Sequence, residues 1–213
     1  MTDFSYLNVD NAYKLINQKV TKTPLVTNDY INNLLEAEIY FKLENLQNTG
    51  SFKLRGATHK ITKLIENVKD SGVVAYSSGN HAQAVAYASM INSISAKIIM
   101  PKTAPQIKIE NTKNYGAEVI LYDTYFQNRE DIGIEIQKKD NRALIKPYDD
   151  EDIIAGQGTA AIEIVNDLEE KSIEPDLYLC CCGGGGLIAG TSTYLKHIYP
   201  NIKSYSVEPD EFD

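Results

Sequence analysis

A lysine lies close to the predicted start of a helix in the segment NTGSFKLRGA, residues 48–57. Ser51 is a helix-capping residue type, and if it caps this helix, Lys53 lies in the first turn. Free backbone N–H groups and the helix dipole disfavour an ammonium there and lower the pKa of the amine. A neutral amine can attack an aldehyde and form a Schiff base. The alternative is a solvated lysine on an amphipathic helix.

A second polar group follows the apolar segment GVVAY, residues 72–76. The next segment, YSSGNHAQA, places hydroxyl, amide and imidazole groups directly before another predicted helix. Hydroxyls and free N–H groups at a helix N-terminus can bind an anion. The side chains that could contact one ligand carboxylate are Ser77, Ser78, Asn80 and His81. The alternative is an ordinary capped helix.

Four consecutive glycines lie between an apolar strand and a helix in the segment CCCGGGGLIAG, residues 180–190. Glycine loses more conformational entropy on folding than any other residue, so a simple turn does not explain four of them. Close approach of a phosphate to bare N–H groups does. A P-loop is excluded because no Lys-Ser or Lys-Thr pair follows.

A nicotinamide-dinucleotide-binding module is the main alternative for this glycine-rich segment. Gly184, Gly186 and Ala189 match G-x-G-x-x-A, and Glu208 lies where a ribose-binding acid belongs. This interpretation leaves Lys53 and residues 76–84, here called the Ser-Asn segment, without a role. A cofactor with both an aldehyde and a phosphate, such as pyridoxal phosphate, gives all three segments a role.

The elements that must position these residues alternate between strands and helices, which predicts parallel sheets with helices on both faces. The β-favouring apolar segments are residues 38–43, 72–76, 96–100, 117–122, 142–146, 176–181 and 203–208. Helical spacing covers residues 54–68, 80–91, 105–115, 129–138, 153–169 and 188–197. In such folds, ligands bind where strands end and helices begin, which is where all three segments lie.

Composition restricts the class of protein. The net charge of -8 among 213 residues argues against binding to a nucleic-acid backbone. No apolar segment has the length of a membrane span, so no membrane partner is expected. The only cysteines, Cys180 to Cys182, have neither metal-ligand nor disulfide-framework spacing, which favours buried small hydrophobes and a reducing cytoplasm.

Four motifs together resemble a known family. KLENLQNTGSFKLRGA, SSGNHAQA, IAGQGT and CGGGGLIAG resemble the fold-type II pyridoxal-phosphate enzymes, in the branch of threonine/serine dehydratases and serine racemases. The resemblance implies two doubly wound α/β domains of the tryptophan synthase β type. It places a small domain at residues 72–148, inserted into a large domain of residues 1–71 and 149–213 that is incomplete at its C-terminus.

The resemblance also implies roles for individual residues. Lys53 would hold the cofactor as a Schiff base, with Phe52 beside it. Asn80 would hydrogen-bond the ring hydroxyl, and Ser78 would be the second catalytic residue, exchanging a proton in racemisation. The phosphate would be held by Gly183, Gly184, Gly185, Gly186 and Leu187. The substrate would contact Ser77, Ser78, Asn80, His81 and Arg129.

The implied activity is β-elimination of threonine or serine to a 2-oxo acid and ammonia, racemisation of serine, or both. A divalent metal, Mg²⁺ or Ca²⁺, is implied in part of the branch, where Glu208 and the carbonyl of Phe212 match two ligands of an incomplete site. Dimers are common in the family, which implies a homodimer. A third alternative is a catalytically silent fragment that keeps the motifs. Tyr148 does not distinguish dehydratase from racemase.

Overall fold

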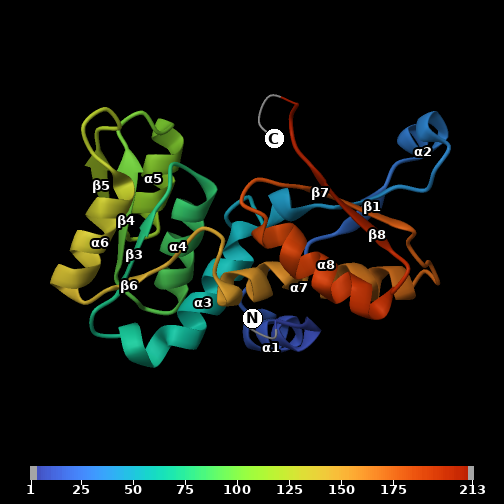
Figure 1. Ribbon diagram of the computed structural model, residues 1–213, viewed down its shortest axis with the longest axis horizontal. Helices are drawn as coiled ribbons and strands as arrows, with labels where there is room; N and C mark the ends of the chain where they lie inside the picture. The colour runs from blue at the N-terminus through green and yellow to red at the C-terminus, as the bar shows by residue number, and fades with distance from the viewer. Residues whose placement is uncertain (1–3, 211–213) are drawn as a thin grey trace.

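The computed structural model describes residues 4–210, and helices and strands alternate along it (Figure 1). The helices are α1 (Tyr6–Ile16), α2 (Asp29–Leu35), α3 (Lys53–Val68), α4 (Asn80–Ile91), α5 (Gln106–Asn114), α6 (Arg129–Asp140), α7 (Glu151–Glu169) and α8 (Gly186–Ile198). The strands are β1 (Leu25–Thr27), β2 (Tyr40–Lys42), β3 (Val73–Tyr76), β4 (Ala96–Pro101), β5 (Glu118–Tyr122), β6 (Ala143–Leu144), β7 (Leu177–Cys181) and β8 (Lys203–Val207). All the predicted elements are present, whereas α1, β1 and α2 were not predicted.

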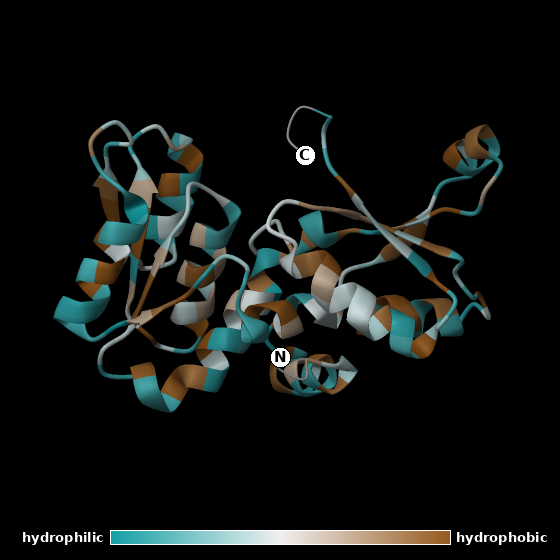
Figure 2. Cartoon of the chain, viewed as in Figure 1, coloured by the Kyte–Doolittle hydropathy of each residue, from teal (hydrophilic) through white to brown (hydrophobic). Residues whose placement is uncertain are grey.

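Strands β3 to β6 form one parallel sheet in the order β5-β4-β3-β6, and all four lie within residues 72–148. Helices α4 and α5 pack on one face of this sheet and α6 packs on the other. Hydrophobic colours follow the strands in Figure 2, and hydrophilic colours appear on the surrounding helices. The predicted parallel arrangement is therefore confirmed for this sheet.

The remaining strands depart from the prediction. β7 and β8 form a parallel pair, but β1 and β2 form an antiparallel pair. Within residues 4–210 these two pairs do not join into one sheet. Residues 28–39, which include the 7-residue helix α2, connect β1 to β2. This connection is at the lower end of the length that a parallel crossover needs, and the chain reverses direction across it, which pairs the two strands antiparallel.

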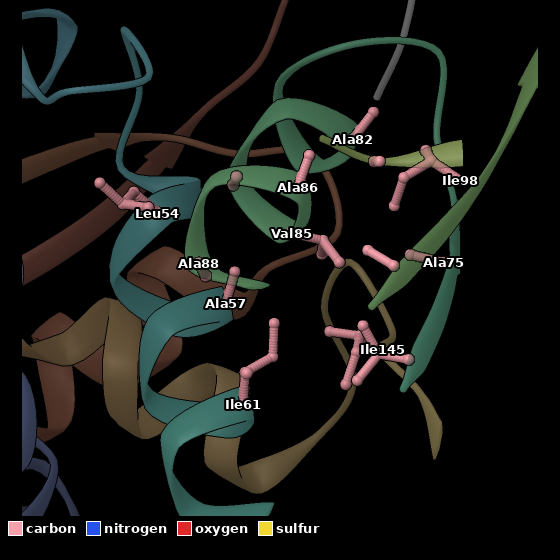
Figure 3. Packing of buried hydrophobic residues seen from close by; sticks show 14 of the residues in the cluster. Leu54, Ala57, Ile61, Ala75, Ala82, Val85, Ala86, Ala88, Ile98 and Ile145 are labelled. Carbon is pink, nitrogen blue, oxygen red and sulfur yellow. The ribbon is translucent and has the colours of Figure 1, made fainter. Parts of the chain in front are cut away.

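Helix α3 links the four-stranded sheet to the rest of the chain. Its buried residues Leu54, Ala57 and Ile61 belong to the core that includes Val85 of α4 and Ile98 of β4 (Figure 3). Several alanines of α4 face this core, and their small side chains let the helices approach closely. The position of Lys53, at the N-terminus of α3, is therefore set by one continuous core.

Glycines set the crossings between α3, α7 and α8. A Cβ on Gly156 would lie 2.6 Å from the Cα of Gly56, so α7 crosses α3 backbone against backbone. A Cβ on Gly190 would overlap the carbonyl oxygen of Ile154 and lie 2.8 Å from the nitrogen of Gly158, so α8 crosses α7 in the same way. This packing fixes the N-terminus of α8 relative to α3.

A buried ionic network adds to this packing. The fully buried guanidinium of Arg55 bonds to Glu163 of α7 at 2.7 and 2.8 Å, and to Glu44 at 2.8 Å. Lys42 of β2 forms a 2.7 Å ion pair with Glu163. Desolvation penalises each of these charges, and the opposite charges offset that penalty. The network ties α3 to α7 two residues after Lys53.

The three cysteines have free thiols, and only Cys180 is buried, while Cys181 is exposed. The prediction that all three are buried is wrong for Cys182, which is only half-buried, and for Cys181, because alternate residues of β7 point to opposite faces. Among the described residues, none of the helices has both the length and the apolar character needed to cross a lipid bilayer.

Candidate active site

The turn before α3 differs from its prediction. Phe52 occupies the N-cap position and Lys53 is the first helical residue. Within residues 4–210 the buried hydroxyl of Ser51 has no hydrogen-bond partner, so the prediction that Ser51 caps the helix is wrong. The chain instead turns at Gly50, whose φ is 72° and whose N–H bonds to Gln47. Lys53 nevertheless lies in the first turn.

The amine of Lys53 faces the segment that follows β6. Its Nζ donates a 2.7 Å hydrogen bond to the carbonyl oxygen of Pro147. The rings of Phe52 and Tyr148 lie 5.2 and 5.9 Å from the same nitrogen. Burial lowers the pKa of Lys53 from its ordinary value of 10.5. Burial therefore shifts this amine toward its neutral, nucleophilic form, in the direction that the sequence predicts.

The glycine bend, residues 183–186, joins β7 to α8. Gly185 is the N-cap of α8 and has a φ of 77°, a conformation that favours glycine. A Cβ on Gly183 or Gly185 would meet no atom of the described residues within 4 Å, so in this part of the chain open space borders the bend. The first N–H groups of α8 have no intrahelical partner and carry the positive end of the dipole. A phosphate fits this arrangement.

Tyr148 connects the amine to the glycine bend. Its ring lies against Gly184 so closely that a Cβ there would overlap ring carbons, and its Cβ would lie 3.4 Å from a Cβ on Gly186. The same ring lies 5.9 Å from the Nζ of Lys53. The first and third segments, far apart in sequence, therefore meet at one aromatic ring.

The Ser-Asn segment lies at the end of β3, a strand that pairs with β4 on one side and with β6 on the other. The N–H of Ser77 bonds to Ile99, and the Ser77 hydroxyl accepts from the N–H of Gly79, which shapes the turn. Ser78 and Asn80 are exposed. The N-terminus of α4 begins at Asn80, so free N–H groups accompany these side chains.

His81 is buried beneath this segment. Its Nε2 donates to the carbonyl of Ile145 at 3.0 Å, and its Nδ1 has no partner among the described residues. Burial lowers the pKa of His81 to about 4, and the nearby charge of Lys53 contributes to the lowering. A contact between the His81 side chain and a substrate carboxylate stays a prediction.

Lys108, which the sequence did not single out, contacts the segment from α5. Its Nζ donates a 2.7 Å hydrogen bond to Oδ1 of Asn80. With its oxygen engaged by the ammonium, the Asn80 amide has its NH₂ group free as a donor. The sequence offers no signal for this contact, because a half-buried lysine in a polar helix is common.

Arg129 lies on the other side of Tyr76. Its guanidinium lies 5.4 Å from the centre of the Tyr76 ring. Both residues line a cavity of about 370 Å³ together with Tyr148 and Lys146. Arg129 and Tyr148 therefore border the same cavity, although they are 19 positions apart in the sequence.

The predicted metal ligands are not brought together in the described part of the chain. The carboxylate of Glu208 lies beside the thiol of Cys182 and raises the pKa of that thiol. Phe212 lies outside the described residues. Residues 4–210 contain no group of three His, Cys, Asp or Glu side chains that could hold a metal ion.

The site suits an aldehyde-bearing phosphate ester. A half-buried amine of lowered pKa faces an aromatic ring, the ring abuts a glycine bend with open space beside it, and an asparagine donor follows a neighbouring strand. Amine, bend and amide are the three groups that pyridoxal phosphate requires for its aldehyde, phosphate and ring hydroxyl.

Comparison with known proteins gives a consistent picture. Residues 16–213 match the family model described as "Pyridoxal-phosphate dependent enzyme". The chain is 42% identical to a serine racemase of Schizosaccharomyces pombe and 41% identical to an L-threo-3-hydroxyaspartate ammonia-lyase of Saccharomyces cerevisiae. Each match covers 97% of this chain and 62% of the relative, so the chain spans less than two thirds of their length.

A solved structure supports the same assignment. The crystal structure of serine racemase from Dictyostelium discoideum superposes with a TM-score of 0.91 at 39% identity. The superposition covers 97% of this chain and 66% of that one. The α/β fold of this chain is therefore shared with that racemase.

Proposed function

Because the chain belongs to the family of pyridoxal-phosphate dependent enzymes, we propose that it acts on small hydroxy-amino acids. The proposed reactions are β-elimination of threonine or serine to the 2-oxo acid and ammonia, and racemisation of serine at the same site. One observation carries the proposal: Lys53 and Gly184 both face the ring of Tyr148. The family match favours this function over a nicotinamide-nucleotide module.

The cofactor would be held by residues of three elements. Lys53 would bind it covalently with Phe52 beside it, Asn80 would donate to its ring hydroxyl, and the bend of Gly183 to Gly186, with Leu187, would hold its phosphate. When bound, pyridoxal phosphate delocalises the negative charge that develops at the substrate α-carbon. The remaining work falls to side chains of the chain itself.

Proton transfer is the task of Lys53 and Ser78. The lowered pKa of Lys53 increases the share of the neutral amine, which is the form that can take the α-proton. Ser78 follows a different strand and is exposed, so it can serve the opposite face of the α-carbon. Elimination needs only the lysine, whereas racemisation needs both groups.

Substrate positioning is the task of the N-terminus of α4. Its free N–H groups, with Ser77, Ser78, Asn80 and His81 beside them, would bind the α-carboxylate. Arg129, at the edge of the neighbouring cavity, would approach the substrate from the side of Tyr76.

The division of the chain into domains is proposed on the same basis. Residues 72–148, which hold the four-stranded sheet, would form the small domain, and residues 1–71 with 149–213 would belong to the large one. The cofactor would lie between them.

Free thiols at three adjacent positions favour a reducing cytoplasm. A homodimer is proposed from the family resemblance.

Borohydride trapping combined with turnover tests this function. The chain is loaded with pyridoxal phosphate, reduced, and digested, and peptide mass spectrometry is expected to locate the label on Lys53. Lys53→Ala should lose both label and turnover of L-threonine and L-serine, while the exposed control Lys69→Ala keeps both. A label on another lysine, or turnover by Lys53→Ala, would refute the assignment.

Ser78→Ala separates the two reactions. We expect it to suppress racemisation of serine more strongly than elimination from the L-enantiomer, measured by chiral chromatography and keto-acid release. Equal loss of both rates would contradict a second base at this position.

A further inference from the structure

The carbonyl oxygen of Pro147 accepts a hydrogen bond from the reactive amine. It lies 2.7 Å from the Nζ of Lys53, although the two residues are 94 positions apart in the sequence. Within residues 4–210, this is the only hydrogen bond of the amine, and Lys53 forms no ion pair with a carboxylate. Lysines that are removed from water are usually paired with an opposite charge, so a neutral acceptor in this place needs an explanation.

Residues 145–150, here called the connecting segment, hold this carbonyl in place. At the start of the segment, Ile145 is fully buried and its N–H donates to the carbonyl of Val74 at 2.8 Å. The carbonyl of Ile145 accepts a 3.0 Å hydrogen bond from Nε2 of His81. Two residues later, the ring of Pro147 restricts φ and so limits rotation of the chain. The chain therefore approaches the amine in a fixed direction.

The far end of the connecting segment is fixed as well. Oδ1 of Asp150 accepts from the N–H groups of Asp152 and Ile153 at 3.0 and 3.1 Å, which makes Asp150 the N-cap of α7. Its Oδ2 forms a 2.9 Å ion pair with Lys60 of α3. The proline carbonyl lies between two anchored points, so its oxygen is a preorganised acceptor.

Such an acceptor has a use in the proposed reaction, because Lys53 becomes positively charged when it takes the α-proton. The proton moves from the α-carbon to Nζ, and the electron pair of the broken C–H bond stays on the substrate. A hydrogen bond to the charged form of a group favours that form. A carbonyl oxygen at 2.7 Å stabilises the ammonium as it forms, whereas a carboxylate would keep the amine protonated from the start.

Other groups that face this amine carry no negative charge. His81 approaches from α4, and burial lowers its pKa to about 4, so its ring is neutral near pH 7. The rings of Phe52 and Tyr148 lie 5.2 and 5.9 Å from the Nζ and attract a positive charge only weakly. Burial lowers the pKa of Lys53, and the carbonyl opposes this effect.

We propose that Pro147 is a positioning residue, whose carbonyl oxygen holds the free amine of Lys53 and stabilises the ammonium that forms when Lys53 takes the α-proton. The inference rests on the proposed function. The role belongs to the backbone, so the sharpest test alters the carbonyl and keeps every side chain.

An ester in place of the peptide bond after Pro147 makes this change. The α-hydroxy analogue of tyrosine at position 148 keeps the ring and converts the Pro147 carbonyl into an ester carbonyl, which is a weaker hydrogen-bond acceptor. Within the described residues, the N–H of Tyr148 donates no hydrogen bond, so its loss leaves no acceptor unpaired. The same replacement at Tyr30, which is exposed on α2, is the control.

The first readout is the rate at which Lys53 of the cofactor-free chain condenses with pyridoxal phosphate, measured against pH. This rate rises as the amine loses its proton. We expect the ester at position 148 to lower the pKa of Lys53 and so to shift the profile to lower pH. The ester at position 30 should leave the profile in place.

Turnover of L-serine by the loaded chain provides the second readout. The ester at position 148 should lower kcat about tenfold and change KM by less than about twofold, because the lost stabilisation concerns the charge that forms during proton transfer. Pro147→Gly keeps the carbonyl but frees φ, so it should lower kcat in the same way, and Pro147→Ala should lower it less.

The inference and the proposed function fail on different results. If the ester at position 148 leaves the pH profile in place, or raises KM with kcat unchanged, this inference is overturned and the proposed function stands. If borohydride does not label Lys53 of the unaltered chain, the proposed function itself fails.

Discussion

Lys108 and Asn80 are joined by a 2.7 Å hydrogen bond in which the ammonium donates to the amide oxygen. The bond comes from α5 and determines which end of the amide faces the candidate cofactor site. An asparagine turned the other way would present an acceptor to a ring hydroxyl that, when ionised, is itself an acceptor.

Removing this ammonium should therefore weaken cofactor binding. We expect Lys108→Met to raise the dissociation constant of pyridoxal phosphate about tenfold, the value of one charge-assisted hydrogen bond. Fluorescence titration of the cofactor-free chain measures it. Lys108→Arg should recover part of the affinity, and the exposed Lys113→Met should not change it. Unchanged affinity in Lys108→Met would show that Asn80 is oriented by other means.

Lys53 should make the stability of the cofactor-free chain depend on alkaline pH. Burial holds its pKa below 10.5 in the folded state. Between the folded pKa and 10.5, the unfolded chain binds more protons, so the free energy of unfolding rises with pH. Lys53→Met lacks this contribution. The stability difference, variant minus wild type, should thus fall as pH rises, as urea denaturation at several pH values would show; a constant difference would contradict it.

Replacing Gly190 or Gly183 with alanine should affect different properties, namely the stability of the fold and the binding of the cofactor. Gly190→Ala places a Cβ against the backbone of α7 and should destabilise the fold by about 1–3 kcal/mol. A Cβ on Gly183 meets no atom of residues 4–210 within 4 Å, so Gly183→Ala should change the free energy of unfolding by no more than about 0.5 kcal/mol. It should instead weaken pyridoxal phosphate binding. Thermal unfolding and cofactor titration measure the two effects, and a destabilised Gly183→Ala would argue for a structural bend.

His81 should make the fold sensitive to acid. Burial lowers its pKa from 6.5 to about 4, so between these values the unfolded chain binds more protons than the folded one. The free energy of unfolding therefore falls as pH drops through this window, by about 3 kcal/mol in total. His81→Gln keeps a donor for Ile145 but cannot titrate, and it should lose this part of the dependence. The exposed His197→Gln is the control in urea denaturation.

Arg55 should be among the most sensitive positions for stability. Arg55→Met leaves the buried carboxylate of Glu163 with Lys42 as its one cationic partner among the described residues, which should cost about 3–5 kcal/mol. The pair of Lys63 and Asp152 offers a contrast, because Lys63 is exposed and the half-buried carboxylate of Asp152 also pairs with Lys60, so Lys63→Met should cost at most about 1 kcal/mol. Chemical denaturation compares the two, and equal costs would mean that burial of the network contributes little.

The order of helices and strands follows from local information. Apolar periodicity predicts where α3 to α8 and β3 to β8 lie, because each buries one stripe or face. The short elements at residues 25–35 carry too few residues for a periodic signal, and β1 pairs with β2 in a direction that depends on the connection between them. Ser51 is a residue type that often caps helices, but the chain turns at Gly50 and the N-cap position of α3 is taken by Phe52.

Residue types and their neighbours along the chain were enough to identify Lys53, the four glycines and the Ser-Asn segment as chemically unusual. Which of them meet was decided by packing between helices distant in sequence. The glycine contacts of α3, α7 and α8 bring both the bend and the amine to the ring of Tyr148, and α5 brings Lys108 to Asn80. Such contacts depend on backbone approach in three dimensions, and no periodicity or local motif encodes them.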